Sequence, residues 1–156
     1  MKNNKTNALR ILDSKKINYK TYDYSDSGMI SGVDVANVLG EDYSVVFKTL
    51  VTVGKSGNHY VFLVPVDKEL NLKLAASVVG EKNIEMIKSR ELLDLTGYIH
   101  GGCSPIGMKK YFTTTIDKSA LDHKSIFFSA GKIGLQVEMD VCDIEKVIKV
   151  NYEKIV

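Results

Sequence analysis

The chain has 156 residues, of which 44% are hydrophobic and 26% charged, and its formal net charge is +2. This composition predicts a soluble globular domain with a substantial core, and no apolar stretch is typical of a membrane span or a signal peptide. So small a net charge does not by itself indicate nucleic-acid binding, nor does it exclude a local basic surface. The two cysteines, Cys103 and Cys142, form neither a disulfide framework nor a Cys-x-x-Cys metal motif, so we expect a reduced, cytoplasmic protein.

The first half of the chain predicts two short helices and three strands. Apolar residues recur at helical spacing after Thr6, and either Thr6 or Asn4 is suited to cap this helix. Ser31-Gly-Val-Asp34 resembles a capping box, and Gly40 is suited to end that helix. In chain order we expect a helix over 6–16, a strand over 19–24, a helix over 31–40, and strands over 44–53 and 59–66 joined by a hairpin turn at 55–58.

The second half predicts three helices and four strands. Gly80 and Gly97 are suited to end two helices. Ser89 is suited to begin the helix that ends at Gly97, and Asp140 is suited to begin a later one. We expect helices over 72–79, 89–95 and 140–148, and strands over 84–87, 110–116, 124–129 and 133–139. Hairpins combined with crossovers are typical of an α/β fold. The sequence therefore predicts one domain over residues 1–156, with a mixed, mostly antiparallel sheet and helices packed around it.

Two glycine-rich segments are the most distinctive feature of the sequence. They are Gly-Tyr-Ile-His-Gly-Gly-Cys-Ser-Pro-Ile-Gly at 97–107 and Ser-Ala-Gly-Lys-Ile-Gly-Leu-Gln-Val-Glu-Met at 129–139. Glycine is favoured where the backbone takes a positive φ or approaches a ligand closely. We expect both segments to line one pocket, where exposed backbone N–H groups would stabilise an oxyanion. The residues that would supply these groups are Gly101, Gly102, Ser104, Ser129, Ala130 and Gly131.

Lys48 lies within Val-Val-Phe-Lys-Thr-Leu-Val, a strand that is apolar on both faces. A lysine at the middle of such a strand is costly unless it is paired or opens into a cleft. The residues leave two interpretations open: a lysine that serves a site, or one that extends from a sheet edge into water.

The sequence contains no recognisable nucleophile system. His100 precedes Cys103 by three residues, and such a pair can form a thiolate nucleophile, but nothing else supports this reading. No two of the three histidines have metal-ligand spacing. We expect neither a metal nor a cofactor.

Three segments in a fixed order carry a resemblance to a known family. They are Lys48-Thr-Leu50 in a strand, Gly101-Gly-Cys-Ser-Pro-Ile-Gly107, and Ser129-Ala-Gly-Lys-Ile-Gly-Leu135. Together they resemble the YbaK/EbsC family of aminoacyl-tRNA deacylases, which is related to the editing insertion of prolyl-tRNA synthetase. The resemblance covers nearly the whole chain and implies that family's fold. It implies that the protein binds the 3′ aminoacyl end of a mischarged tRNA and associates with prolyl-tRNA synthetase. It implies no binding to DNA or to a membrane.

The resemblance also implies the site residues. Lys48 would anchor the anionic 3′ end of the tRNA and position the ester, and it forms the catalytic set with Gly101 and Ser129. The tyrosine near the substrate would be Tyr24, with Tyr22 as the competitor. The implied substrate-binding residues are Tyr24, Ile30, Thr49, Gly102, Ser104, Ala130, Gly131 and Gln136.

Two departures from the family affect the choice of amino acid. The best-known cysteinyl deacylases carry aspartate at the position of Gln136 and phenylalanine near Ile30-Ser31. The leading hypothesis is removal of cysteine from Cys-tRNA(Pro), and also from Cys-tRNA(Cys), by attack of the substrate's own thiol on its ester. The alternatives are an Ala-tRNA(Pro) deacylase that uses water or the tRNA 2′-hydroxyl, and a non-catalytic module that binds a synthetase or an aminoacyl-tRNA.

Overall fold

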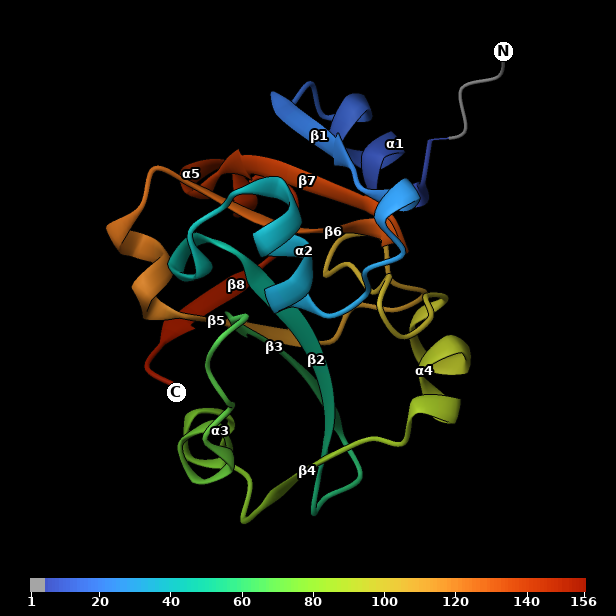
Figure 1. Ribbon diagram of the computed structural model, residues 1–156. Coiled ribbons are helices and arrows are strands. Elements are labelled where there is room, and N and C mark those ends of the chain that lie inside the picture. Colours follow the sequence, from blue (N-terminus) through green and yellow to red (C-terminus); the bar gives the residue numbers. More distant parts are fainter. Residues whose placement is uncertain (1–4) are drawn as a thin grey trace.

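The computed structural model describes residues 5–156 and contains two β-sheets, with short helices around them (Figure 1). One sheet has the strand order β4-β2-β3-β5-β8 and the other the order β1-β7-β6. The strands are β1 (Tyr19–Asp23), β2 (Phe47–Gly54), β3 (His59–Pro65), β4 (Ile84–Met86), β5 (Thr113–Asp117), β6 (Ser125–Lys132), β7 (Leu135–Asp140) and β8 (Val150–Glu153). The α-helices are α1 (Asn7–Ser14), α2 (Gly32–Leu39), α3 (Leu72–Val79), α4 (Ser89–Thr96) and α5 (Val141–Ile144).

The predicted α/β class is confirmed, and so is the mixed, mostly antiparallel pairing. β2 pairs antiparallel with β3 and β4, and β7 pairs antiparallel with β1 and β6, whereas β5 is parallel to both β3 and β8. The strands form two sheets instead of the one expected. The sheets meet at a single parallel bridge between Val46, just before β2, and Phe127 in β6.

Most helix ends follow the predicted caps, and the alternative first cap, Asn4, lies outside the described residues. Thr6 and Ser31 accept hydrogen bonds from the backbone N–H groups of Leu9 and Asp34, each at 3.2 Å. Gly40, Gly80 and Gly97 end their helices in the left-handed conformation. The start of α4 differs from the prediction, because Lys88 is the capping position, and its N–H donates to the Glu91 carboxylate at 3.0 Å.

Several other predicted elements have different bounds. The strand expected over 124–129 extends from Ser125 to Lys132. The strand expected from 44 begins at Phe47, because Asp42 caps a short 3₁₀ turn over Tyr43–Val45. The strand expected from 110 begins at Thr113. The helix expected through 148 ends at Ile144, and the chain then adds β8, a strand that was not predicted, parallel to β5.

The core has two main clusters on the two faces of the larger sheet. One cluster includes Phe47, Val51 and Phe128, and it fills the space between the sheets. The other packs Phe62 and Val64 with the helix α3. β2 thus has apolar side chains on both faces, as its sequence predicts. Among the described residues, no helix has the length and apolar character needed to cross a membrane.

Candidate functional site

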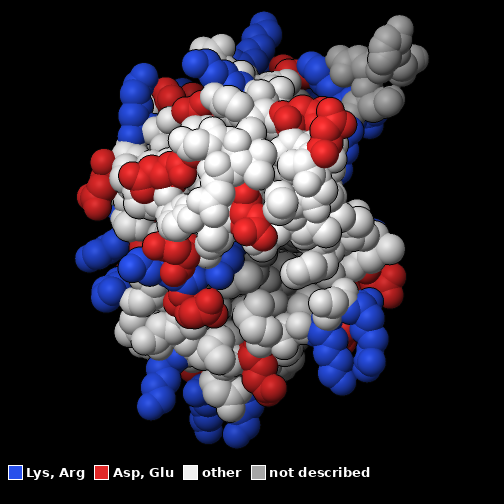
Figure 2. All heavy atoms as spheres, in the orientation of Figure 1, with Lys and Arg blue, Asp and Glu red and all other residues white. Residues whose placement is uncertain are grey.

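A cavity of about 760 Å³ opens where β2 and β6 separate. It is lined by residues from β2 and β6, from α2 and the loop before it, from the segment between β4 and α4, and from the glycine-rich loop after α4. Figure 2 shows a recess in the middle of this face. Its border consists mostly of uncharged atoms, with Asp or Glu atoms directly above it and at its lower left, and Lys or Arg atoms at its left and lower right. The separation of the two sheets therefore produces the site.

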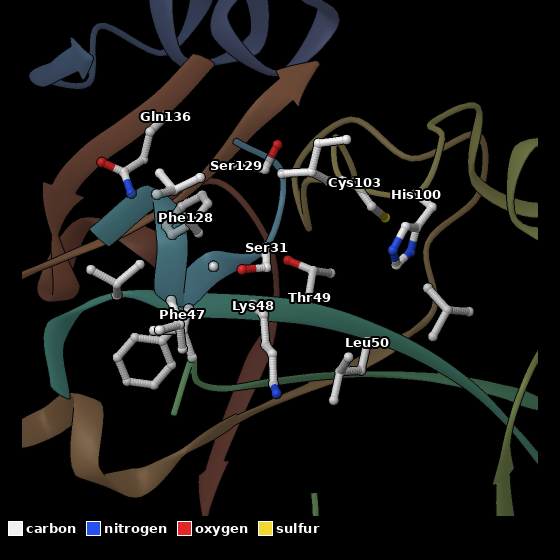
Figure 3. Close-up of a pocket in the computed structure, with 18 of the residues that line it drawn as sticks. Ser31, Phe47, Lys48, Thr49, Leu50, His100, Cys103, Phe128, Ser129 and Gln136 are labelled. Atoms are coloured by element: carbon white, nitrogen blue, oxygen red, sulfur yellow. The ribbon is translucent and has the colours of Figure 1, made fainter. Parts of the chain in front are cut away.

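Lys48 and Thr49 both line the cavity, although they leave β2 on opposite sides (Figure 3). The Lys48 side chain is 29% exposed, and its Nζ lies 3.8 Å from Oε2 of Glu69, whose carboxylate is almost fully exposed. Such an ion pair contributes little to stability, because water competes for both charges. Lys48 is therefore a positively charged group at the border of the cavity, available to bind an anionic ligand.

The cavity-facing edge of β2 has free backbone groups. The Val66 N–H donates to the Val46 carbonyl at 2.9 Å. Residues 46, 48 and 50 therefore direct their backbone N–H and C=O groups toward β3, where they pair with residues 66, 64 and 62. In an antiparallel ladder, the alternate residues direct their N–H and C=O groups to the other edge. Thr49 is one of them, and β4 covers that edge only from Thr52 onward. The Oγ1 atom of Thr49 is also buried without a hydrogen-bond partner.

The two glycine-rich segments meet, as the sequence predicted they would. A Cβ atom on Gly102 would lie 2.8 Å from the backbone nitrogen of Ile133 and 2.9 Å from Cα of Lys132. The backbone of the first loop therefore packs directly on the turn between β6 and β7. Gly101 has φ +87°, and a Cβ there would lie 2.6 Å from Cγ2 of Ile30. These contacts require residues without side chains.

The structure brings seven of the eleven predicted site residues into the lining of the cavity. They are Tyr24, Ile30, Lys48, Thr49, Gly101, Ser129 and Gln136. Four others lie behind it: Gly102, Ser104, Ala130 and Gly131. Ser104 and Ala130 are completely buried, and a Cβ on Gly131 would contact Tyr98 and Thr6. Ser129 lines the cavity together with its neighbour Phe128, whereas Ala130 is buried and lies outside the lining, where the pairing of β6 with β7 shifts register between Ser129 and Lys132.

The two candidate tyrosines lie in different environments. Tyr24 is buried in the lining of the cavity, and its N–H donates to the Gly134 carbonyl at 2.8 Å. Burial raises the pKa of the Tyr24 hydroxyl. The Tyr22 hydroxyl instead donates to Glu138 at 2.7 Å, which raises the pKa of Tyr22 to about 12. The placement thus favours Tyr24 as the tyrosine near a ligand.

Gln136 lies deep in the cavity, with only 3% of its surface exposed, and its Oε1 atom has no hydrogen-bond partner. The Glu41 carboxyl lies beside its amide, and neither carboxyl oxygen has a partner of normal geometry. Burial raises the pKa of Glu41, and the charge of Glu138 adds to this effect. The Gln136 amide partly offsets the effect of burial on Glu41, and the Oε1 atom of Gln136 remains an unpartnered acceptor. Sequence reasoning missed this pair because Glu41 is remote from Gln136 in the chain.

Cys103 and His100 both line the cavity, but Cys103 is unsuited to act as a nucleophile. Burial raises the pKa of its thiol to about 12, so the thiol stays protonated at neutral pH. The sequence pointed to His100 only as a partner of Cys103, because residues as far apart in the chain as Lys48, His100 and Ser129 show no sign of a common cavity. In Figure 3 the imidazole points into the open space of the cavity, across from Thr49.

Replacing Cys103 by alanine should leave kcat/KM within about threefold of wild type, because the protonated thiol supplies no nucleophile. The loss of one buried sulfur should lower the stability by about 1 kcal/mol. Steady-state deacylation and thermal unfolding test both expectations. A hundredfold loss of activity in a folded variant would identify Cys103 as a nucleophile after all.

Outside the cavity, the described residues include one cluster with metal-ligand spacing: Asp140, Cys142 and Asp143. Lys124 lies 3.9 Å from the Asp140 carboxylate, and Lys146 lies 2.8 Å from that of Asp143. Lysine ammonium groups already compensate these charges, so the cluster gives no reason to revise the expectation that the protein needs no metal.

Comparisons with known proteins agree on one family. Residues 30–147 match the family model described as "Aminoacyl-tRNA editing domain". Over 136 residues the chain is 44% identical to the protein named "Putative Cys-tRNA(Pro)/Cys-tRNA(Cys) deacylase EbsC" of Enterococcus faecalis (strain ATCC 700802 / V583). That match covers 86% of this chain and 83% of the relative.

Two solved structures have the same fold. The crystal structure of "hypothetical protein APE2540" has a TM-score of 0.87 at 19% identity, covering 96% of this chain and 99% of that one. The crystal structure of "a putative trans-editing enzyme for prolyl tRNA synthetase" has a TM-score of 0.84 at 21% identity, covering 98% of both chains. At these identities the likeness concerns the fold alone.

Proposed function

The chain belongs to the aminoacyl-tRNA editing domain family, and from that premise we propose that it is a trans-editing deacylase that removes cysteine from mischarged Cys-tRNA(Pro), with Cys-tRNA(Cys) as a second substrate. The observation that carries the proposal is the 44% identity to EbsC over 86% of the chain. The whole chain would act as one deacylase domain in the cytoplasm, where it would intercept tRNA released by prolyl-tRNA synthetase.

Energetics explain why such an enzyme is needed. A hydrophobic pocket discriminates against one missing methylene by only about 1–3 kcal/mol, so a synthetase makes errors with smaller or isosteric amino acids. A second site with different selectivity then removes the wrong product.

The substrate's own thiol would be the nucleophile. The thiol sulfur would attack the ester carbonyl carbon, and the bond from that carbon to the terminal ribose oxygen would break. The products would be a free tRNA 3′ end and a four-membered thiolactone, which water opens to cysteine. The protonated Cys103 supports this route, because the described lining offers no competing thiolate. Cleavage by cyclisation would make the enzyme a lyase.

In this scheme the protein positions the ester and stabilises its oxyanion. Lys48 at the border of the cavity would hold the anionic 3′ end. The backbone at Gly101 and the free edge at Thr49 would donate to the oxyanion, with the Ser129 hydroxyl beside them. The unpartnered Oε1 atom of Gln136 would accept a hydrogen bond from the substrate's α-ammonium group.

The test is to incubate the protein with tRNA(Pro) charged with cysteine, alanine or proline, and with Cys-tRNA(Cys), and to follow release of each amino acid. We expect cysteine to be released from both tRNAs, and Ala-tRNA(Pro) and Pro-tRNA(Pro) to persist at their uncatalysed rates. Rapid release of alanine would identify an alanyl deacylase. Binding of all the charged tRNAs without release of any amino acid would identify a non-catalytic module.

A further inference from the structure

His100 lies on a turn whose backbone is fixed on both sides. The Gly102 N–H donates to the Ile99 carbonyl at 2.9 Å, so residues 99–102 form a β-turn with His100 at its second position. Gly101, at the third position, has the positive φ that a type II turn requires. Gly101 also packs against Ile30 and Ile133, and Gly102 against the β6–β7 turn. Contacts between the two loops thus fix the backbone that carries His100, and its side chain is exposed.

The imidazole is free to serve a ligand. It lines the cavity, and among residues 5–156 it has no hydrogen bond or ion pair. It points into the open space toward Thr49, the residue on the free edge of β2 (Figure 3). A base in this place faces the same volume as Ser129 and Gly101, the residues expected to hold the ester.

The other titratable side chains in the described lining are poorly suited to accept a proton at neutral pH. Burial raises the pKa of both Cys103 and Tyr24, which keeps each of them protonated. Lys48 leaves β2 on the side opposite to Thr49 and lies near the Glu69 carboxylate. An imidazole, in contrast, is the side chain suited to exchange a proton between pH 5 and 8.

We propose that His100 is the general base that deprotonates the substrate thiol and then the acid that protonates the leaving tRNA oxygen. The inference rests on the proposed function. The imidazole nitrogen takes the proton from sulfur, and the sulfur forms its bond to the carbonyl carbon. As the bond from that carbon to the ribose oxygen breaks, the imidazolium returns the same proton to that oxygen. No proton is gained or lost overall, and no other reactant is required.

The test compares the pH dependence of kcat for wild type, His100→Gln and the control His123→Gln, on Cys-tRNA(Pro) between pH 5.5 and 9. A general base typically contributes 10²- to 10⁴-fold. We expect His100→Gln to lower kcat by about 100-fold at pH 7 with little change in KM. Wild-type kcat should depend less steeply on pH than kcat of His100→Gln, because a base of the enzyme takes the thiol proton. In the variant, kcat should keep rising toward about pH 8.5, the ordinary pKa of a thiol. His123 lies outside the cavity lining, so His123→Gln should match wild type.

A second variant distinguishes base catalysis from a structural role. Added imidazole should restore part of the activity of His100→Ala, because it can occupy the vacated space. If His100→Gln keeps the wild-type kcat and pH profile, or if only KM changes, the assignment of a base is wrong. Absence of rescue in a folded His100→Ala variant would likewise contradict it. If wild type releases no cysteine at any pH, the proposed function is wrong, and the assignment of His100 as its general base is wrong as well.

Discussion

Lys48→Ala should lower kcat/KM for Cys-tRNA(Pro) by about 100-fold, while the melting temperature changes by only a few degrees. A hydrogen bond to a charged group contributes about 1.5–3 kcal/mol, and the variant loses this contact with the anionic 3′ end. The fold loses only an ion pair with the exposed Glu69 carboxylate, at 3.8 Å, which contributes at most about 1 kcal/mol. In a chain of this size that corresponds to about 2–4 °C.

The matched control for Lys48→Ala is Glu69→Gln, which removes the carboxylate of the ion pair but leaves the lysine cation. It should retain the wild-type kcat/KM, and Lys48→Arg should retain more activity than Lys48→Ala because it keeps the charge. If Lys48→Ala instead unfolds the protein, or if Glu69→Gln is equally inactive, then the ion pair serves the fold and Lys48 has no role in binding the tRNA end.

Gly102→Ala should have the largest combined effect on stability and activity. A Cβ atom there would lie 2.8–2.9 Å from backbone atoms of Lys132 and Ile133, closer than real Cβ contacts come. Because neither backbone can rotate away as a side chain could, the two loops must separate. Overpacking of this kind costs typically 1–3 kcal/mol. We expect the melting temperature to fall by about 3–10 °C and kcat/KM by at least about tenfold, because Gly101 and His100 belong to the displaced turn.

Gly57→Ala is the control for this substitution. Gly57 has φ +93° at the β2–β3 hairpin, but a Cβ there would meet no atom within 4 Å. The control should therefore lose some stability through backbone strain and keep the wild-type activity. Wild-type activity in Gly102→Ala would show that the contact between the loops is irrelevant to the site.

Short-range signals in the sequence predicted much of the fold. The caps at Thr6, Ser31 and Gly80 fix helix ends through local hydrogen bonds and glycine geometry, and these predictions are confirmed. The division into two sheets could not be predicted in this way. It depends on which strands pair, and alternation along one strand carries no information about its partner. The strand β8 was missed for a different reason: its four residues, Val150–Glu153, are too few for a clear alternating pattern.

The site shows a similar limit. Motif order placed Lys48, Gly101 and Ser129 in one pocket, and the structure brings them to a common cavity. Substrate contacts at both Ser129 and Ala130 stay a prediction, and the structure places only Ser129 in the lining of the cavity. The proximity of Glu41 to Gln136 and the position of His100 depend on tertiary packing, which no local pattern in the chain specifies.

In the proposed mechanism the substrate's thiol, not a group of the enzyme, attacks the ester. The most direct test is single-turnover cleavage of Cys-, Ser- and Ala-tRNA(Pro) by the wild-type protein, together with competition of the Ser ester against the Cys ester. A serine hydroxyl is nearly isosteric with the thiol but a far weaker nucleophile near neutral pH, because an alkoxide is inaccessible there. We expect Ser-tRNA(Pro) to compete for the site yet to remain uncleaved, and Ala-tRNA(Pro) to persist. Cleavage of all three esters at similar rates would contradict this mechanism and would indicate an activated water as the nucleophile.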